Sequence, residues 1–390
     1  MSSHASNSPP IAIIGAGPSG LTLARLLEVK NIPYIVFDRD VSPDAARGGG
    51  SLDLGPGSGQ MALSEAGLFD KFKPLARYQD QAFRILDKQA DLVWAKPNEE
   101  SDDRPEIDRK ALRRMLLESI PQERVKWDAR VKSLKREADS SMAVQLANGN
   151  VETGFKLVVG ADGGWSKARD MITPVKPRYT GLCYLQGNIH TTNEFHSTVC
   201  SRVGPGAYMA LGDGNNLYVQ RQGNGSYQIF AGGRFPEGWW RTNQERFRSL
   251  QFREQLIADR YSDWSSQITD LIRYSDGFDY VWALYETPSE SVPWEHVPGV
   301  TLVGDAAHLT GPNGEGVNIA LYDSLQLAQE IEQAGVGNLD DAVRKYEKKM
   351  FPRALEHIAA GEEGVRMFFA EDAAENFKNN AGAIFESGEV

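Results

Sequence analysis

The chain has 390 residues, of which 41% are hydrophobic and 24% charged, and its formal net charge is −11. This length predicts roughly two to three structural units with a sizeable core, and the acidic balance excludes a nucleic-acid-binding surface, which requires a basic face. No apolar run of roughly 18 residues predicts a membrane span, and residues 1–10 lack the features of a secretory signal. Because only Cys183 and Cys200 are present, no disulfide framework is expected. We therefore expect a cytoplasmic protein without nucleic-acid or membrane partners.

The first predicted unit is a strand followed by a glycine-rich turn and a helix. An apolar run at residues 11–14 leads into Gly15, Gly17 and Gly20. In this arrangement the first glycine allows a tight turn and the second lets the backbone approach a pyrophosphate. The third lets the helix pack closely on its strand. The pattern predicts a site for the adenosine half of a dinucleotide.

The residues after the first glycines extend the same site. Pro18 and Ser19 lie where the helix begins, and the dipole there favours phosphate charge. A second apolar strand at residues 34–37 ends in Asp38, close to the ~20-residue spacing expected for a carboxylate on a ribose hydroxyl. Asp38 is therefore the predicted ribose contact, with Arg39 beside it.

The next elements follow from helical and alternating hydrophobic spacing. A glycine-dense loop at 47–59 indicates close backbone approach or mobility. The spacing then predicts a helix over 60–72 that Gly67 interrupts, a helix over 108–120 with Asp108 as N-cap, short strands between 125 and 159, and a hairpin turn at 147–150.

The pattern changes in the middle of the chain. Short alternating runs separated by glycine and asparagine turns predict an antiparallel sheet, with strands at 184–189, 208–211, 217–220 and 227–231. Two helices are predicted at 247–261 and 265–272. A buried strand returns at residue 300, and helices follow over 317–332 and 338–369.

Two later strands end in acidic turns. The strand at 157–160 leads to Asp162 and Gly163, with Ser166 and Arg169 spaced three apart. The strand from residue 300 leads to Gly304 and Asp305. Because the carboxyl ends of parallel strands meet at one sheet edge, we expect these turns to join the first glycines there.

The second acidic turn has the chemistry of a ring-binding site. Asp305 can accept hydrogen bonds from a polyol. Gly316, Val317 and Asn318 offer backbone amides at a helix N-terminus. Such amides suit the edge of an electron-rich ring that gains negative charge on reduction.

Together these motifs resemble the single-component FAD-dependent aromatic hydroxylases, the flavoprotein monooxygenases related to p-hydroxybenzoate hydroxylase. The resemblance covers residues 9–350. Within this group it is strongest to the tetracycline-inactivating monooxygenases, on the segments 49–54, 57–60, 105–109, 186–190 and 346–351. It implies an α/β fold with a Rossmann-type FAD-binding domain, an inserted β-rich substrate domain and a long C-terminal helix. The implied boundaries are FAD domain 9–176 and 293–333, substrate domain 177–292 and C-terminal helical segment 338–385.

The resemblance also implies roles for individual residues. The cofactor-binding positions are Gly15, Gly17, Pro18, Ser19, Gly20, Asp38, Arg39, Asp53, Arg109, Asp162, Asp305, Gly316, Val317 and Asn318. Arg47 is a candidate for NADPH phosphates. The substrate candidates are Gln186, Tyr208, Phe230 and Pro312. No catalytic side chain is expected, since the flavin C4a-hydroperoxide carries the chemistry, and no histidine, cysteine and carboxylate spacing predicts a metal.

The implied function is an NADPH-consuming monooxygenase with non-covalent FAD. It would act as a monomer, inserting one oxygen atom from O2 into an aromatic or polycyclic molecule, tetracycline-like compounds included. A flavin-dependent reductase or dehydrogenase without oxygen insertion is the alternative from the same motifs. A flavin halogenase lacks its tryptophan signature here, and a non-enzymatic flavin-binding module would leave the inserted sheet without a purpose.

The chain departs from the group pattern in two places. The segment after His308 is about one residue shorter than usual, and Glu315 replaces a glutamine in a loop expected against the flavin. Phe230 falls near the position of a histidine in the tetracycline enzymes.

Overall fold

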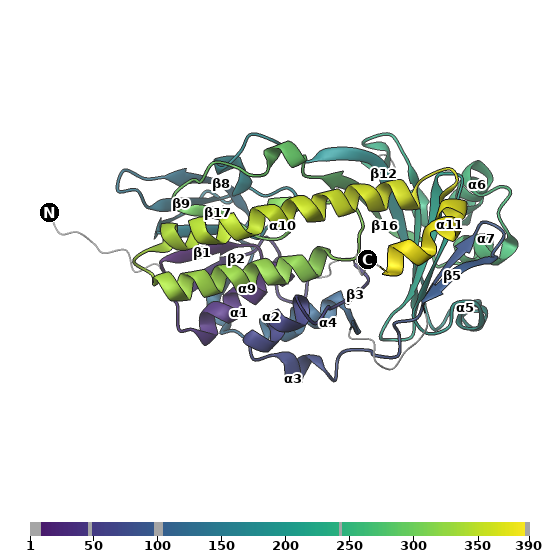
Figure 1. The fold of residues 1–390 in the computed structure, drawn as a ribbon, viewed down its shortest axis with the longest axis horizontal. Helices are drawn as coiled ribbons and strands as arrows, with labels where there is room; N and C mark the ends of the chain where they lie inside the picture. The colour runs from purple at the N-terminus through teal and green to yellow at the C-terminus, as the bar shows by residue number, and fades with distance from the viewer. Residues whose placement is uncertain (1–8, 46–48, 97–103, 242–243, 387–390) are drawn as a thin grey trace.

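The computed structural model describes residues 9–45, 49–96, 104–241 and 244–386. Among these residues, the strands gather into a parallel sheet at one end of the molecule and a larger, mostly antiparallel sheet at the other (Figure 1). The long helix α10 (Leu339–Phe368) runs the length of the molecule from one sheet to the other.

The parallel sheet has five strands in the order β17-β11-β1-β2-β7. Their bounds are β1 Ile11–Ile14, β2 Tyr34–Phe37, β7 Val125–Lys126, β11 Leu157–Gly160 and β17 Val300–Leu302. Strand β1 pairs in parallel with β11 and β2, and β11 pairs in parallel with β17. The three predicted motif strands are therefore adjacent, which confirms that their carboxyl ends share one edge.

Helices pack around this sheet and contribute buried side chains to its hydrophobic core. They are α1 Pro18–Val29, α2 Gly59–Glu65, α3 Phe69–Phe72, α4 Arg109–Leu117, α8 Asp305–His308 and α9 Gly316–Ala334. Leu21, Leu23, Leu26 and Leu27 of α1 are buried in this core. The predicted break at Gly67 is confirmed. Gly67 lies between α2 and α3 and has a φ of 66°, which is outside the helical range.

A small antiparallel sheet and a two-stranded ribbon complete this part. The small sheet holds β8 Val131–Arg136, β9 Met142–Leu146 and β10 Val151–Phe155, and the predicted hairpin turn joins β9 to β10 with Gly149 at a φ of 94°. The ribbon pairs β3 Ser51–Asp53 with β6 Glu106–Asp108. The sequence did not predict this ribbon, because three residues are too few to show alternation.

The second sheet has the order β16-β12-β15-β14-β13-β4-β5. Its strands are β4 Phe83–Asp87, β5 Leu92–Lys96, β12 Arg178–Ile189, β13 Ala207–Gly212, β14 Asn215–Arg221, β15 Tyr227–Arg234 and β16 Phe278–Glu286. The four predicted strands are confirmed. However, this sheet also contains the hairpin formed by β4 and β5. These strands precede residue 177 and were expected to belong to the FAD domain.

Helices α5 His196–Val203, α6 Leu250–Arg260 and α7 Ser266–Arg273 pack on one face of this sheet. Helix α6 begins later than predicted, since Ser249 caps it by accepting a hydrogen bond from the Phe252 amide. The other face points toward the parallel sheet and is crossed by the end of α10 and by α11 Ala373–Glu386. No helix of the described residues is long and apolar enough to span a membrane.

Candidate cofactor and substrate site

A large cavity lies between the carboxyl edge of the parallel sheet and the inner face of the second sheet. Its volume is about 3030 Å³, whereas pockets for drug-sized ligands are commonly about 300–1,000 Å³. Gly15, Gly17, Asp162 and Asp305 line it on one side, and the second sheet lines it on the other. The cavity can therefore hold a dinucleotide together with a second molecule.

Gly15 and Gly17 line this cavity, and the three glycines of the motif have different roles. Gly15 has a φ of 107°, and a Cβ there would collide with the Ala161 carbonyl. A Cβ on Gly20 would collide with the Gly15 carbonyl, so Gly20 serves close packing. By contrast, a Cβ on Gly17 would meet no described atom within 4 Å. Gly17 therefore faces open space, where a ligand can approach the backbone.

Helix α1 presents its N-terminus to that space. Gly17 is the N-cap, Pro18 is the first helical residue, and no described side chain caps the helix. Ser19 lines the cavity, but its hydroxyl is engaged by α9, where it donates to the Ala320 carbonyl at 3.2 Å and lies 3.1 Å from the Ser324 hydroxyl. The backbone amides of the first turn are thus the groups available to a phosphate.

Asp38 lines the cavity and accepts hydrogen bonds from two backbone amides. Its Oδ2 accepts a hydrogen bond from the Ala16 amide at 2.5 Å, and its Oδ1 accepts one from the Asp40 amide at 2.8 Å. Asp38 therefore supports the glycine turn through Ala16 and its own turn through Asp40. Its predicted ribose contact stays a prediction. Arg39 is exposed and lines the cavity beside it.

Arg113 is a supporting residue that was not predicted from the sequence. It is buried and donates hydrogen bonds to the Ala16 carbonyl at 3.0 Å and the Pro43 carbonyl at 2.9 Å. It also pairs with Asp40 at 3.0 Å. Its position one helical turn after Arg109 on the same face was the available signal.

The second motif joins two strand ends. Asp162 accepts a hydrogen bond from the Lys167 amide at 2.8 Å on Oδ2, while its buried Oδ1 has no hydrogen-bond partner among the described residues. Burial raises the pKa of this carboxyl. Arg169 donates to the carbonyls of Asp305 and Ala306, each at 2.9 Å. The Ser-x-x-Arg spacing therefore fastens the β11 turn to α8.

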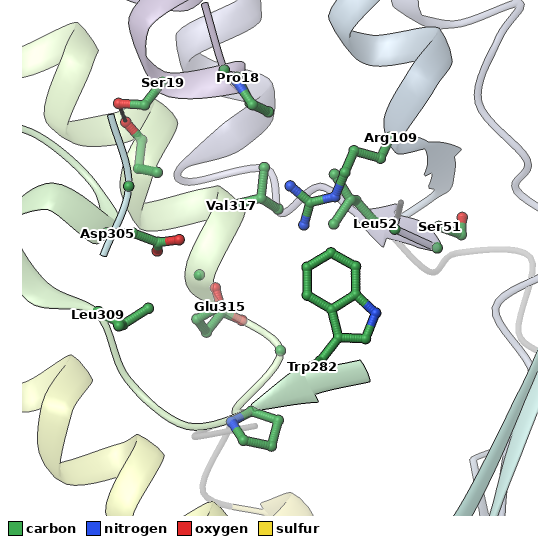
Figure 2. A pocket seen from close by; sticks show the side chains of 18 of the residues that line it. Pro18, Ser19, Ser51, Leu52, Arg109, Trp282, Asp305, Leu309, Glu315 and Val317 are labelled. Carbon is green, nitrogen blue, oxygen red and sulfur yellow. Dashed lines mark hydrogen bonds between the residues drawn. The ribbon is translucent and has the colours of Figure 1, made fainter. Parts of the chain in front are cut away.

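The third motif presents a carboxylate and a helix end. Figure 2 shows the Asp305 carboxylate pointing into the cavity, with Val317 across from it. Helix α9 begins at Gly316, and no described side chain caps it. The side chain of Asn318 is buried, whereas the contribution predicted for this residue was its backbone amide, which stays a prediction. The side chain accepts from the Gly55 amide at 2.8 Å and donates to the Asp53 carbonyl at 3.1 Å.

An ion-paired cluster spans the ribbon and the loop before α9. Arg104 donates to Asp53 Oδ2 at 2.7 Å and pairs with Glu315 on its other side. This pairing is a physical reason for the glutamate at position 315. Arg109 also reaches into the cavity (Figure 2), and a Cβ on Gly49 would lie 2.6 Å from its Cδ. Arg104 was not predicted, because its partners are distant in sequence.

The second sheet supplies aromatic walls. The ring-bearing residues of this sheet that line the cavity are Phe83, Trp94, Tyr184, Tyr218, Phe230, Tyr280 and Trp282. The Tyr218 and Phe230 rings lie 5.8 Å apart, and the Tyr184 and Phe230 rings 6.3 Å apart. Trp282 projects toward Arg109 and Glu315 (Figure 2). Most of these aromatic residues escaped prediction because only the fold brings their strands together.

Two of the four predicted substrate residues line the cavity and two do not. Phe230 and Pro312 line the cavity. Tyr208 does not, because it packs in the core beneath the helices on the opposite face of the sheet. Gln186 is 1% exposed and lies behind the wall, where its Oε1 accepts a hydrogen bond from Trp282 Nε1 at 2.6 Å. Arg47 lies outside the described residues.

These groups fit FAD. The two uncapped helix ends offer amides to a pyrophosphate and to a ring edge, and Asp305 offers a carboxylate to polyol hydroxyls. The buried Asp162 Oδ1 has a free lone pair beside the same space. A Cβ on Gly314 or Gly316 would meet no described atom within 4 Å, so the loop before α9 leaves room for a ring system.

Comparisons with known proteins agree with this class of site. Residues 9–191 match the FAD binding domain family. The monooxygenase penA of Penicillium thymicola is 30% identical, over 95% of this chain and 97% of its own. The structure of Klebsiella pneumoniae HpxO, solved with FAD and uric acid, has a TM-score of 0.79 at 19% identity, covering 97% of this chain and 95% of that one. The tetracycline destructase Tet(55) has a TM-score of 0.74 at 20% identity, covering 98% and 97%.

The fold and site therefore define a flavoprotein with a large cavity between a parallel sheet and a second, mostly antiparallel sheet. The chain belongs to the family of FAD-dependent monooxygenases. The two solved structures share its fold at identities too low to carry their substrates over.

Proposed function

We propose that the enzyme uses NADPH as reductant and inserts one oxygen atom from O2 into an aromatic or polycyclic small molecule. The observation that carries this proposal is the continuity of the cavity, in which the FAD-binding edge and the aromatic walls enclose one space. Residues 9–176 and 293–333 would hold FAD, and residues 177–292 together with β4 and β5 would hold the substrate. When bound, FAD supplies the redox chemistry that activates O2.

The side chains of this chain position the reactants and exclude water. The α1 amides would bind the pyrophosphate, Asp305 the ribityl hydroxyls, and the amides of Gly316 and Val317 the ring edge. The aromatic walls would stack on a flat substrate and keep water from the reacting atoms. Tetracycline-like compounds belong to the proposed range because a cavity of about 3030 Å³ has room for several fused rings.

Basic side chains that line the cavity support the proposal that NADPH is the reductant. The cavity is also lined by the exposed residues Arg39, Lys110, Arg130 and Lys167. Cations at the mouth of a cleft attract a phosphorylated nicotinamide by long-range electrostatics. No second strand, glycine turn and helix unit exists in the sequence, so NADPH would bind at this mouth.

The test is turnover of purified yellow protein with a panel of aromatic and polycyclic compounds under ¹⁸O2. We expect at least one compound to stimulate NADPH oxidation and to gain a single ¹⁸O atom by mass. NADH in place of NADPH provides the matched comparison. Substrate-stimulated NADPH oxidation with no ¹⁸O in any product would favour the reductase or dehydrogenase alternative.

A further inference from the structure

Two carboxylates lie side by side on the β3–β6 ribbon at the edge of the cavity. Asp53 and Glu106 are directly opposite each other in the antiparallel register, and both line the cavity. Directly opposed residues have their Cβ atoms about 4.5–5.5 Å apart, and like charges in such a pair repel. Ser51 and Leu52 mark this ribbon in Figure 2.

The two carboxylates have different hydrogen-bond partners, one cationic and one neutral. Asp53 accepts a charge-assisted hydrogen bond from the Arg104 guanidinium at 2.7 Å, so it has a cationic partner. Glu106 has a neutral partner, the Gln220 amide, at 3.3 Å. Arg77, whose charge also acts on Glu106, is engaged by Asp80 at 2.9 Å and Asp108 at 2.8 Å. Glu106 is therefore the member of the pair that gains or loses a proton most readily.

The electrostatics agree with this geometry. Burial and the Asp53 charge raise the pKa of Glu106 to about 7, with Asp80 adding to the rise, while Ser51 and Arg77 oppose it. A carboxyl of this kind in a cavity titrates where a general base is useful.

Glu106 also faces the aromatic part of the cavity. Tyr218, two residues along β14 from Gln220, contributes its ring to the wall. Burial and then the charge of Glu106 hold the pKa of Tyr218 well above its ordinary value. The Tyr218 phenol therefore stays protonated, which leaves Glu106 as the proton acceptor at this wall.

We infer that Glu106 accepts the proton of a hydroxyl group on the substrate, so that the substrate is a phenol or an enol. This inference rests on the proposed function for its aromatic ligand. The O–H bond of the substrate breaks, its electron pair stays on the substrate oxygen, and the proton forms the neutral Glu106 carboxyl. The transfer relieves the repulsion between Asp53 and Glu106, and it makes the ring richer in electrons before oxygen insertion.

The experiment measures binding to the FAD-loaded enzyme with matched probes. Phenol, 2-naphthol and 9-phenanthrol are each compared with their methyl ethers by fluorescence quenching across the pH range. At pH above the Glu106 pKa of about 7, we expect at least one hydroxyl compound to bind roughly tenfold more tightly than its ether, as a charge-assisted hydrogen bond allows. This advantage should fall as the pH drops below 7 and Glu106 becomes protonated.

Glu106→Gln is the central variant because it keeps the shape of the side chain and its contact with Gln220. We expect it to lose both the preference for the hydroxyl compound and its pH dependence. Glu118→Gln is the matched control, since Glu118 is exposed, 61% at its side chain, and is paired with Arg114 at the cavity mouth. It should retain the wild-type ratio.

Infrared difference spectra of the wild type give a second readout. Binding of the hydroxyl compound above pH 7 should add a protonated-carboxyl C=O band, which the ether should not add. Equal binding of every hydroxyl compound and its ether, or no new carboxyl band, would overturn the inference even if Glu106→Gln failed to fold. If ¹⁸O enters a product while these outcomes occur, only the role of Glu106 fails. If Glu106-dependent binding occurs without ¹⁸O in any product, only the proposed function fails.

Discussion

Asp305 is the residue at which loss of one side chain tests the FAD site most directly. Its carboxylate points into the cavity, while its backbone carbonyl is held by Arg169 at 2.9 Å. Asp305→Ala should therefore keep the turn and lose a charge-assisted hydrogen bond, weakening FAD binding by ~1–3 kcal/mol. Titration of the apoprotein with FAD, followed by flavin fluorescence, measures the change. Asp305→Asn should lose less, and unchanged affinity in both variants would place Asp305 in an ordinary turn.

We expect Gln186 to affect substrate binding through Trp282. Because its Oε1 accepts the indole N–H at 2.6 Å, it fixes the ring that projects into the cavity. Gln186→Ala should raise the Kd for 2-naphthol roughly tenfold, the equivalent of one lost hydrogen bond, and leave FAD content unchanged. Trp282→Phe removes the N–H that Gln186 accepts. In this background, the additional Gln186→Ala substitution should therefore change the Kd for 2-naphthol very little. Additive effects would mean that Gln186 acts independently of Trp282.

The sequence predicted residues whose place depends on local backbone geometry. It did not predict side chains whose partners are distant in the sequence. Gly15, Gly17 and Asp305 were placed correctly at the cavity, since turn geometry and strand ends are local properties. Tyr208 was misplaced because one-residue alternation decides which face of a strand is buried. Arg104, whose partners lie 51 and 211 residues away, could not be found without the fold.

At the scale of elements, α10 supports the loop between α8 and α9. Gly361 and Gly364 of α10 lie against this loop, and a Cβ on Gly361 would collide with the Thr310 hydroxyl and lie 3.0 Å from the Gly311 amide. The helix was predicted from its spacing, but not this contact, because a glycine inside a helix does not identify the segment that packs on it.

Gly361→Ala should therefore displace the loop that carries Pro312 and Glu315. Overpacking of this kind typically costs about 1–3 kcal/mol, and we expect the loss in both the free energy of unfolding and the affinity for FAD. Urea denaturation and FAD titration measure the two quantities. Thr310→Ala should restore part of the loss by removing the hydroxyl. Gly337→Ala, where a Cβ would meet no described atom within 4 Å, should behave as the wild type.

At the scale of the whole molecule, a buried polar network couples α8, α9 and α10. Asp323, fully buried, accepts from His308 at 2.6 Å and from Arg353 at 2.7 Å. His357 lies beside it, with its ring 5.4 Å from that of His308 and its Nδ1 accepting from Asn313 at 3.0 Å. Burial and the nearby His308 lower the pKa of His357 to about 3. Global stability should therefore depend on pH through this histidine.

In the unfolded chain His357 takes up a proton below its ordinary pKa of 6.5, whereas in the folded chain it stays neutral down to about 3. Unfolding thus binds a proton between these values, and stability should fall as the pH drops through this window, by up to about 1.4 kcal/mol per pH unit. The pKa of Asp323 is also lowered, so its contribution is lost only below the ordinary carboxyl range, toward the acid end of the window. His357→Gln keeps an acceptor for Asn313 but cannot titrate. Urea denaturation from pH 8 to pH 5 should show a constant difference from the wild type above 6.5 and a progressively smaller wild-type advantage below it. A difference that stays constant down to pH 5 would mean that folding leaves the protonation of His357 unchanged.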